Sequence, residues 1–458
     1  MASASVCTGW GVLEEVRRAF SRPGFWRFCV LACGWVQVQG WHTVTRALMA
    51  AGVAGKRHHE AFHRFFSRGS WKPDVLGRLL LLALLRLLPA GAQLLFALDD
   101  TLCPKRGPHV FGIGSHRDAV LSSARHKVLR FGHVWVVLAL VVRLPFAPQR
   151  AFALPVCLRL YRTKKECARA RAPFRTKTQL AAEMLRQLAA WLGGRGRRVR
   201  IVMDGAYCCD TVLKPLPEGF VAFGAMRPDA ALTAAPPARR AAHQRGRART
   251  RGQRLPAPAQ LAAHRADARC WKRCGAHLYG RTQRVQVQAF QAQWYRVTGA
   301  RLLRVVVVRT GAGTRPFRTF FCTDAGLSAR EVLETYALRW SLEVTFRELK
   351  QLLGFADSPA RKRQSVLRTA PFVAFLYSLL VLGFARQARA GLRRALRLLP
   401  PRPWYGQKQG ICFEDILRAT RHGLQGVDVL RPALSKPLRQ KNKPRPLPHS
   451  GLLLTASG

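Results

Sequence analysis

Acidic residues are scarce in this 458-residue chain, which has 23 Asp and Glu against 77 Lys and Arg and a formal net charge of +54. With so few acids, the chain cannot neutralise its basic residues internally. The excess positive charge repels itself unless a polyanion binds the protein. Part of the excess follows from a composition rich in Arg, Ala, Gly and Pro, as a GC-rich gene produces. The remainder predicts nucleic acid as the partner.

Cysteines and long apolar runs are also few. The 12 cysteines are scattered, which excludes a disulfide scaffold and predicts reduced thiols in a cytoplasmic protein. The N-terminal residues show no apolar segment after a basic start, so we expect no secretory signal. The longest apolar run, 372–385, is shorter than the ~20 residues of a membrane span. It predicts a buried core helix and no membrane partner.

Apolar runs closed by turn residues predict an α/β sheet in the middle of the chain. The residues before 90 follow a helical pattern, and a basic helix is expected over 164–192. Short apolar runs that suit strands buried on both faces occupy 93–100, 132–146, 199–207, 302–310 and 317–323. Between them, the stretch RVQVQAFQAQWYRV alternates as a half-exposed strand does.

The stretch YALRWSLEVTFRELKQLLGF (336–355) predicts an amphipathic helix. Ser328 and Glu331 form an S-x-x-E capping box before it, and Gly354 can end it. At 100° per residue, the side chains of Tyr336, Arg339, Glu343 and Lys350 share a sector of about 60° beside a leucine stripe. One interpretation is an ordinary surface helix with i,i+4 ion pairs; the other is a functional face.

Two further acids favour the functional interpretation. Asp100 closes one apolar strand and Asp204 lies near the end of another. In a chain so poor in acids, carboxylates at the ends of buried strands are costly without a neighbouring cation. A divalent metal ion would supply that cation.

The pattern Y-x2-R-x3-E-x6-K, preceded by DDT at 99–101 and MDG at 203–205, resembles the DDE transposases of bacterial insertion sequences. It looks most like the insertion-sequence-four superfamily and its seven-oh-one branch. The resemblance implies an RNase H-like fold, with a mixed α/β sheet flanked by helices. It also implies that Asp100, Asp204 and Glu343 bind Mg²⁺ or Mn²⁺ and are catalytic. Tyr336, Arg339 and Lys350 belong to its signature, and we expect them to contact DNA.

Asp99 is the alternative to Asp100 as the first metal ligand. The two side chains alternate faces on a regular strand, so only one can point at the metal. The family places its catalytic Asp directly before Thr or Ser, and in this chain Asp100 precedes Thr101. This favours Asp100 and leaves Asp99 as a strand-end acid.

The function expected from this resemblance is metal-dependent cleavage of DNA at the element's terminal inverted repeats, followed by strand transfer into target DNA. Two metal ions can activate the attacking oxygen and stabilise the leaving oxygen of such a reaction. A homodimer is expected in the DNA complex, because two ends must be brought together. The alternatives are a catalytically inactive DNA-binding descendant and a basic RNA-associated scaffold, and the second does not explain carboxylates on buried strands.

The expected organisation has five parts. The first is a helical N-terminal region expected to bind DNA, where we expect His58, His59 and His63 to contact solvent or phosphate. Two parts of a catalytic domain flank a basic, β-containing insertion, and a helical region with a basic tail follows. The corresponding ranges are 1–90, 91–228, 229–300, 301–358 and 359–458.

Overall fold

A computed structural model gives the fold of the chain and is described here for most of its length. The described residues are 11–107, 109–118, 121–123, 125–193, 198–237, 249–263, 270–309, 317–389, 391–400 and 410–425. The Lys- and Pro-rich tail, which the sequence predicts to be disordered, lies outside the described residues.

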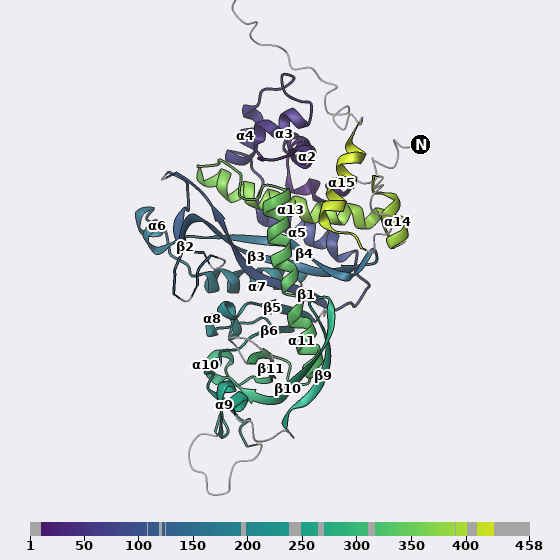
Figure 1. Ribbon diagram of the computed structural model, residues 1–458. Coiled ribbons are helices and arrows are strands. Elements are labelled where there is room, and N and C mark those ends of the chain that lie inside the picture. Colours follow the sequence, from purple (N-terminus) through teal and green to yellow (C-terminus); the bar gives the residue numbers. More distant parts are fainter. Residues whose placement is uncertain are drawn as a thin grey trace, which may run out of the picture.

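A mixed sheet of twelve strands runs through the described part of the protein (Figure 1). Its central strand β1 pairs antiparallel with β3 on one side and parallel with β5 on the other, and β5 pairs parallel with β6. β4 continues the antiparallel side beyond β3. These strands are β1 (Leu94–Pro104), β3 (Leu129–Leu144), β4 (Ala147–Tyr161), β5 (Val199–Met203) and β6 (Phe220–Ala225). The mixed sheet flanked by helices confirms the expected RNase H-like fold class.

The sheet continues from β6 into strands that follow later in the chain. β12 pairs antiparallel with β6, β11 with β12, and β10 with β11. The strands and helices of this extension are β7 (Leu232–Thr233), β8 (Arg254–Leu255), α9 (Pro258–Ala263), β9 (Lys272–Leu278), β10 (Arg281–Gln293), α10 (Tyr295–Thr298), β11 (Leu302–Arg309) and β12 (Phe317–Cys322). The first four residues of β10 are exposed, and exposed and covered residues then roughly alternate as far as Gln291. The predicted alternating strand ends at Gln293, because α10 follows.

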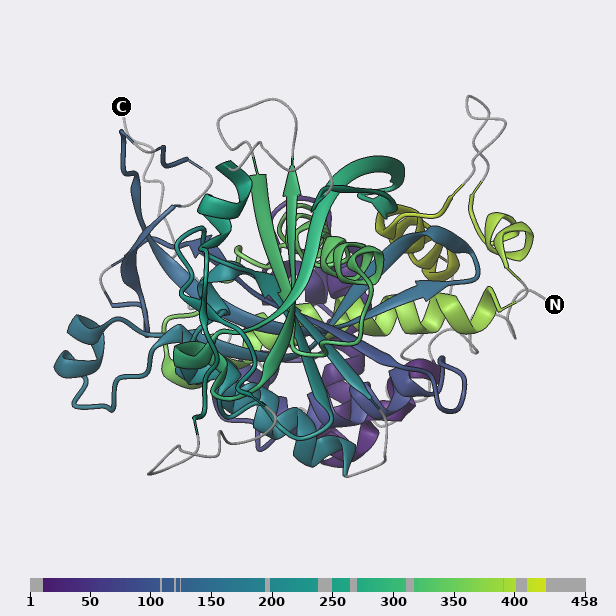
Figure 2. The same ribbon diagram turned by 90° about the horizontal axis from the view of Figure 1, so that it is seen from below.

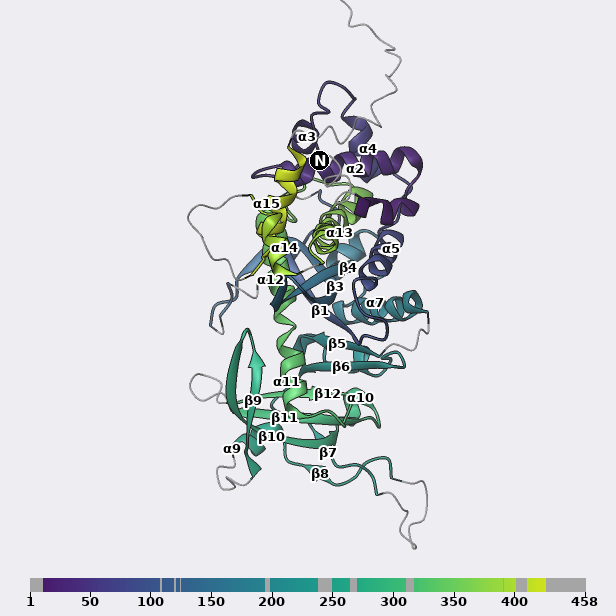
Figure 3. The same ribbon diagram turned by 90° about the vertical axis from the view of Figure 1, so that its right-hand side faces the viewer.

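Helices cover both faces of the sheet, as Figure 3 shows with α7 on one side and α11 and α12 on the other. The helices between β4 and β6 are α6 (Lys164–Arg169), α7 (Lys177–Leu192), η2 (Gly205–Tyr207) and α8 (Asp210–Leu213). The prediction of one helix over 164–192 was wrong. Pro173, which cannot continue a helix, and the positive φ of 45° at Arg171 separate α6 from α7.

The predicted helix around residue 336 is also interrupted, so the prediction of one continuous helix was wrong. It forms α11 (Ala329–Ala337) and α12 (Trp340–Leu352), joined by a tight turn in which the N–H groups of Leu338 and Arg339 donate to carbonyls three residues back. The capping box of Ser328 and Glu331 is confirmed. Gly354 ends the second helix at φ 61°, where an added Cβ would lie 2.5 Å from the Asp357 carboxylate.

The first and last parts of the chain pack together in the upper layer of Figure 1. The first helices are η1 (Gly11–Ala19), α2 (Arg22–Gln37), α3 (Val44–Ala50), α4 (Glu60–Ser67) and α5 (Pro73–Leu85), and the last are α13 (Arg363–Gln387), α14 (Leu392–Arg397) and α15 (Phe413–Leu424). Figure 2 shows α13 crossing the molecule behind the strands. This helix is long and apolar enough to cross a membrane, yet 94% of its most apolar window is buried inside the protein, as expected of a core helix. A short strand, β2 (Gly114–Arg117), pairs with the start of β3.

Candidate active site

Sheet register brings three aspartates to one place. The parallel pairing of β1 with β5 ends where Leu98 lies opposite Met203. Asp99 and Asp100 continue β1 along β3, opposite Val137 and Val136. Because β5 stops at Met203, Asp204 follows directly beside Asp99 at the point where the two strands separate.

Asp204 ends β5 and caps the short helix η2. Its Oδ2 accepts a hydrogen bond from the N–H of Ala206 at 3.3 Å, which fixes the backbone where it leaves the sheet. Its charge reaches both neighbouring groups, since it contributes to raising the pKa values of Asp99 and Tyr336. The carboxylate of Asp204 therefore lies near Asp99 in the middle of β1 and near Tyr336 in the last turn of α11.

Arg339 joins Asp99 to Glu343. Its Nη1 lies 2.7 Å from Asp99 Oδ2, and its Nη2 lies 2.6 Å from Glu343 Oε1. The arginine side chain is 15% exposed and that of Asp99 16%, whereas Glu343 is 33% exposed. Burial acts against the charged arginine, but the two carboxylates help to raise its pKa, so the guanidinium stays protonated. The Nε of Arg339 is buried and has no hydrogen-bond partner among the described residues.

Asp100 points to other partners, as strand alternation requires. Its Oδ1 accepts a hydrogen bond from the Tyr207 hydroxyl at 2.7 Å, and its Oδ2 lies 2.8 Å from Lys177 Nζ. Lys177 begins α7, immediately after the capping box at Thr176. Burial, and then the charge of Asp100, raise the pKa of Tyr207, so this phenol is a neutral donor. Each oxygen of Asp100 thus has one donor in this arrangement.

Negative charge accumulates around Asp99. Burial raises the pKa of its carboxyl to about 7, and Asp204 and Asp100 add to the rise, while Arg339 and the N–H of Asp100 oppose it. Three carboxylates in so small a space favour a bound cation. Carboxylate oxygens are the ligands that Mg²⁺ and Mn²⁺ prefer, so the donor set fits such an ion in kind. Within the described residues, no three His, Cys, Asp or Glu side chains are yet arranged to hold one.

The three signature residues expected to contact DNA lie at different distances from this cluster. Arg339 is within it. Tyr336 is buried behind Arg339, with its ring 4.6 Å from the ring of Phe320, and burial raises its pKa to about 12. Lys350 lies three turns farther along α12, close enough to Cys103 of β1 to counteract the rise that burial causes in that thiol's pKa. The structure therefore brings Arg339 and Tyr336 to the carboxylates and places Lys350 along the strand that carries them.

Several residues of this region are not identified by the sequence analysis. Tyr207 lies only three residues after Asp204, a signal that could have indicated it, whereas Lys177 is one basic residue among many. Tyr279 and Trp340 are 54% and 51% exposed, and their ring centroids are 6.2 Å apart. Tyr279 has a positive φ of 52° at the turn between β9 and β10. This turn therefore places an exposed aromatic pair next to Arg339.

Comparisons with known proteins match two family models to overlapping parts of the chain. A family model described as DDE superfamily endonuclease matches residues 32–300, more than half of the chain, and includes both strand-end aspartates. A second model, for archaeal ISC1217 transposases, matches residues 284–393 and includes Glu343. No curated protein matches the chain. Among solved structures, the piggyBac transposase synaptic complex with hairpin DNA matches with a TM-score of 0.42 and 9% identity, over 96% of this chain and 86% of that one.

Proposed function

The chain belongs to the DDE superfamily of endonucleases, and from this premise we propose that it is an active transposase of a bacterial insertion sequence. It would cut DNA at the terminal inverted repeats of its element and join the cut ends to target DNA. The observation that carries this proposal is the meeting of Asp99 and Asp204 with the Arg339–Glu343 pair where the parallel pairing of β1 with β5 ends. Such a site suits phosphoryl transfer, which depends on positioning and charge stabilisation.

In the proposed reaction, Asp204 and Glu343 would hold Mg²⁺ or Mn²⁺ together with one of two adjacent acids. The sequence favours Asp100, whereas Asp99 is the acid that Arg339 joins to Glu343. When bound, the ions would activate the attacking oxygen and stabilise the leaving oxygen of the phosphodiester. The protein's own contribution is the placement of these acids. Asp99 is the alternative to Asp100 as the first metal ligand. Arg339 now neutralises Glu343 at 2.6 Å, so Glu343 becomes available to a metal ion when the guanidinium moves to a phosphate. Tyr336 would support Arg339, and Lys350 would meet the backbone farther along.

DNA would lie across basic surfaces on both sides of this site. A cavity of about 1000 Å³ lies beyond the end of β1, and its lining contains many cations and one acid, which already pairs with Arg162. The basic lining residues are Lys105, Arg106, Arg130, Lys165 and Arg169. We also propose that the helical region 1–90 and the insertion 229–300 carry much of the DNA affinity, outside the catalytic parts 91–228 and 301–358. A homodimer in the cytoplasm would hold two element ends.

The test of this proposal replaces Glu343 with Gln. This change keeps the size of the side chain and removes its charge, whereas DNA affinity depends on the many Lys and Arg elsewhere. Cleavage of a DNA fragment that carries the element's end should stop, while binding of that fragment in a gel should persist. The wild type should cut with Mg²⁺ or Mn²⁺ and stop with EDTA.

Glu334→Gln is the matched control. Glu334 lies on α11, where it pairs with Arg330 and accepts the N–H of His277, and it has no contact with Asp99 or Asp204 among the described interactions. Gln keeps the acceptor for His277, so this variant should both bind and cut. A Glu343→Gln protein that cuts as well as the wild type would contradict the catalytic assignment. A wild type that binds the end but never nicks it with either metal would establish the catalytically inactive DNA-binding descendant instead.

A further inference from the structure

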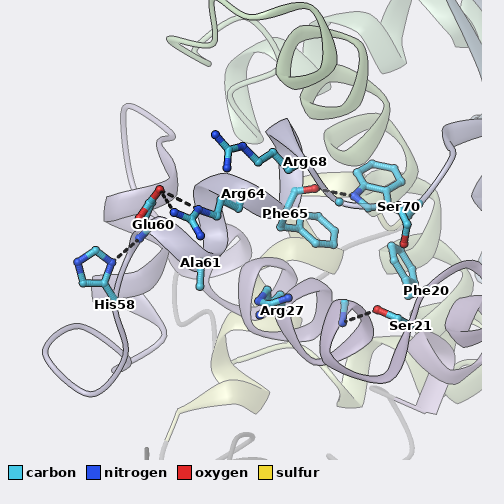
Figure 4. A pocket seen from close by; sticks show the side chains of 13 residues that line it. Phe20, Ser21, Arg27, His58, Glu60, Ala61, Arg64, Phe65, Arg68 and Ser70 are labelled. Carbon is cyan, nitrogen blue, oxygen red and sulfur yellow. Dashed lines mark hydrogen bonds and ion pairs between the residues drawn. The ribbon is translucent and has the colours of Figure 1, made fainter. Parts of the chain in front are cut away.

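A second cationic site lies in the N-terminal helices, far along the chain from the carboxylates. A cavity of about 360 Å³ opens between the first turns of α2 and the helix α4 (Figure 4). Its polar lining is mainly basic, with Arg27 from α2, Arg64 and Arg68 from α4 and its end, and His58 before it. We propose that this N-terminal pocket binds a phosphate group.

Most of this positive charge is available to a ligand. Glu60 is the only acid that lines the pocket, and it pairs with Arg64, whose Nη2 lies 2.6 Å from its Oε1. The hydrogen bond from Arg64 lowers the pKa of Glu60, so this pair is ionised and locally neutral. Arg27 and Arg68 make no ion pair with any described residue, and the buried Nε of Arg27 has no hydrogen-bond partner among them.

The shape of the cavity selects the chemical class of the ligand. One wall consists of Phe20, Phe65 and Trp71, which pack against one another, with Phe65 and Trp71 stacked at 5.1 Å. Phe65 and Trp71 are each 3% exposed, and the Trp71 Nε1–H donates to the Phe65 carbonyl at 2.9 Å. These ring faces are already covered, so the wall cannot stack a base. The polar groups of the lining are mainly guanidinium and hydroxyl, the donors that recognise phosphate.

Hydroxyl and main-chain groups complete the donor set. Ser21 caps α2 and accepts the N–H of Gly24 at 3.3 Å, which leaves its own hydroxyl proton free to donate. Ser70 also lines the cavity. Figure 4 shows Arg27 approaching from the α2 side, and Arg64 and Arg68 from the α4 side, with Phe65 beside them. The start of α2 adds a favourable dipole to the arginines.

The phosphate group could belong to the DNA backbone or be a free phosphate ion. The first source deepens the proposed function, since it places a backbone contact in the helical region expected to bind DNA. The second source requires no DNA. Both depend on the same two unpaired arginines, so one pair of substitutions tests both.

The test compares the full-length wild type with Arg27→Gln/Arg68→Gln. The control is Arg18→Gln/Arg78→Gln, which removes equal charge from exposed residues of the same region outside the pocket. In filter binding to duplex DNA, each lost phosphate contact flattens the plot of log K against log salt by about 0.9, so the pocket variant should lose about 1.8. The single variant Arg68→Gln, at an exposed position, should lower the steepness of this plot by about 0.9. It serves as a check in case replacement of Arg27 prevents folding.

The second arm measures melting temperature in sodium phosphate and in sodium chloride of equal ionic strength. If the site binds free phosphate, phosphate should raise the melting temperature of the wild type and the control but not that of the pocket variant. The two double variants should then show equal slopes of log K against log salt in DNA binding. A backbone site predicts the difference in slope. If neither measurement separates the pocket variant from its control, the phosphate site is refuted. These assays measure binding only, so a failure of the Glu343→Gln test leaves their outcome intact.

Discussion

Asp99 and Asp100 are adjacent in sequence, and the structure predicts different consequences of replacing each with Asn. Asp100→Asn removes an ion pair to Lys177, whose side chain is 40% exposed, and keeps an acceptor for Tyr207. We expect it to lower stability by about 1 kcal/mol. Asp99→Asn removes a pair in which both side chains are about 15% exposed. Because burial raises the pKa of Asp99 to about 7, the folded protein already disfavours this charge, and Glu343 still pairs with Arg339; the neutral amide should therefore cost less than about 1 kcal/mol.

The two variants should separate stability from catalysis. For a chain of this length, about 1 kcal/mol shifts the melting temperature by about 1 °C, so scanning calorimetry should show a drop of about 1 °C for Asp100→Asn and a smaller one for Asp99→Asn. If Asp100 is the metal ligand, Asp100→Asn should lower the rate of Mg²⁺-dependent end cleavage by about 1000-fold, or about 4 kcal/mol. Asp99→Asn should keep measurable cleavage at a temperature where it is folded. The reverse result, with Asp100→Asn active and Asp99→Asn inactive, would refute the assignment and transfer the role to Asp99.

Part of the sheet could be predicted from sequence, because strands such as β3, β5 and β11 are apolar runs and these signals are local. The strands β4 and β6 were not identified from the sequence. Register could not be predicted in this way. The pairing of Leu98 with Met203, which places Asp99 beside Asp204, joins residues far apart in the chain. The separation of α6 from α7 was predictable, because Pro173 is a local signal. The turn at Leu338 and Arg339 contains neither Pro nor Gly, so no composition rule indicates it.

The candidate site shows the same division between local and long-range information. The ion pair of Arg339 with Glu343 follows from i,i+4 spacing, and the structure confirms it at 2.6 Å. The second partner of Arg339, Asp99, is 240 residues away, and Lys177 lies 77 residues from Asp100. In a chain with 77 basic residues, charge alone does not single out the two that reach the aspartates. The sequence therefore predicts the acids better than the groups that neutralise them.

Two further substitutions test the surroundings of the site. Tyr207→Phe removes the hydrogen bond to Asp100 from a buried phenol, and chemical denaturation should show a loss of about 1.5 to 3 kcal/mol; an unchanged midpoint would mean that Lys177 alone holds Asp100. Asp357→Asn tests a second carboxylate, whose pKa burial would raise, whereas the nearby His42 ring and the hydrogen bond from the His42 main-chain N–H lower it. The pKa of this carboxyl is lower in the folded protein than in the unfolded chain. Its contribution to the free energy of unfolding is therefore present above the unfolded pKa, near 4, and is lost as the pH falls through the folded pKa. The stability difference between wild type and Asp357→Asn should therefore be constant at neutral pH and shrink below about pH 4. A difference that stayed constant through that acid range would show that the carboxylate contributes through packing and not through its charge.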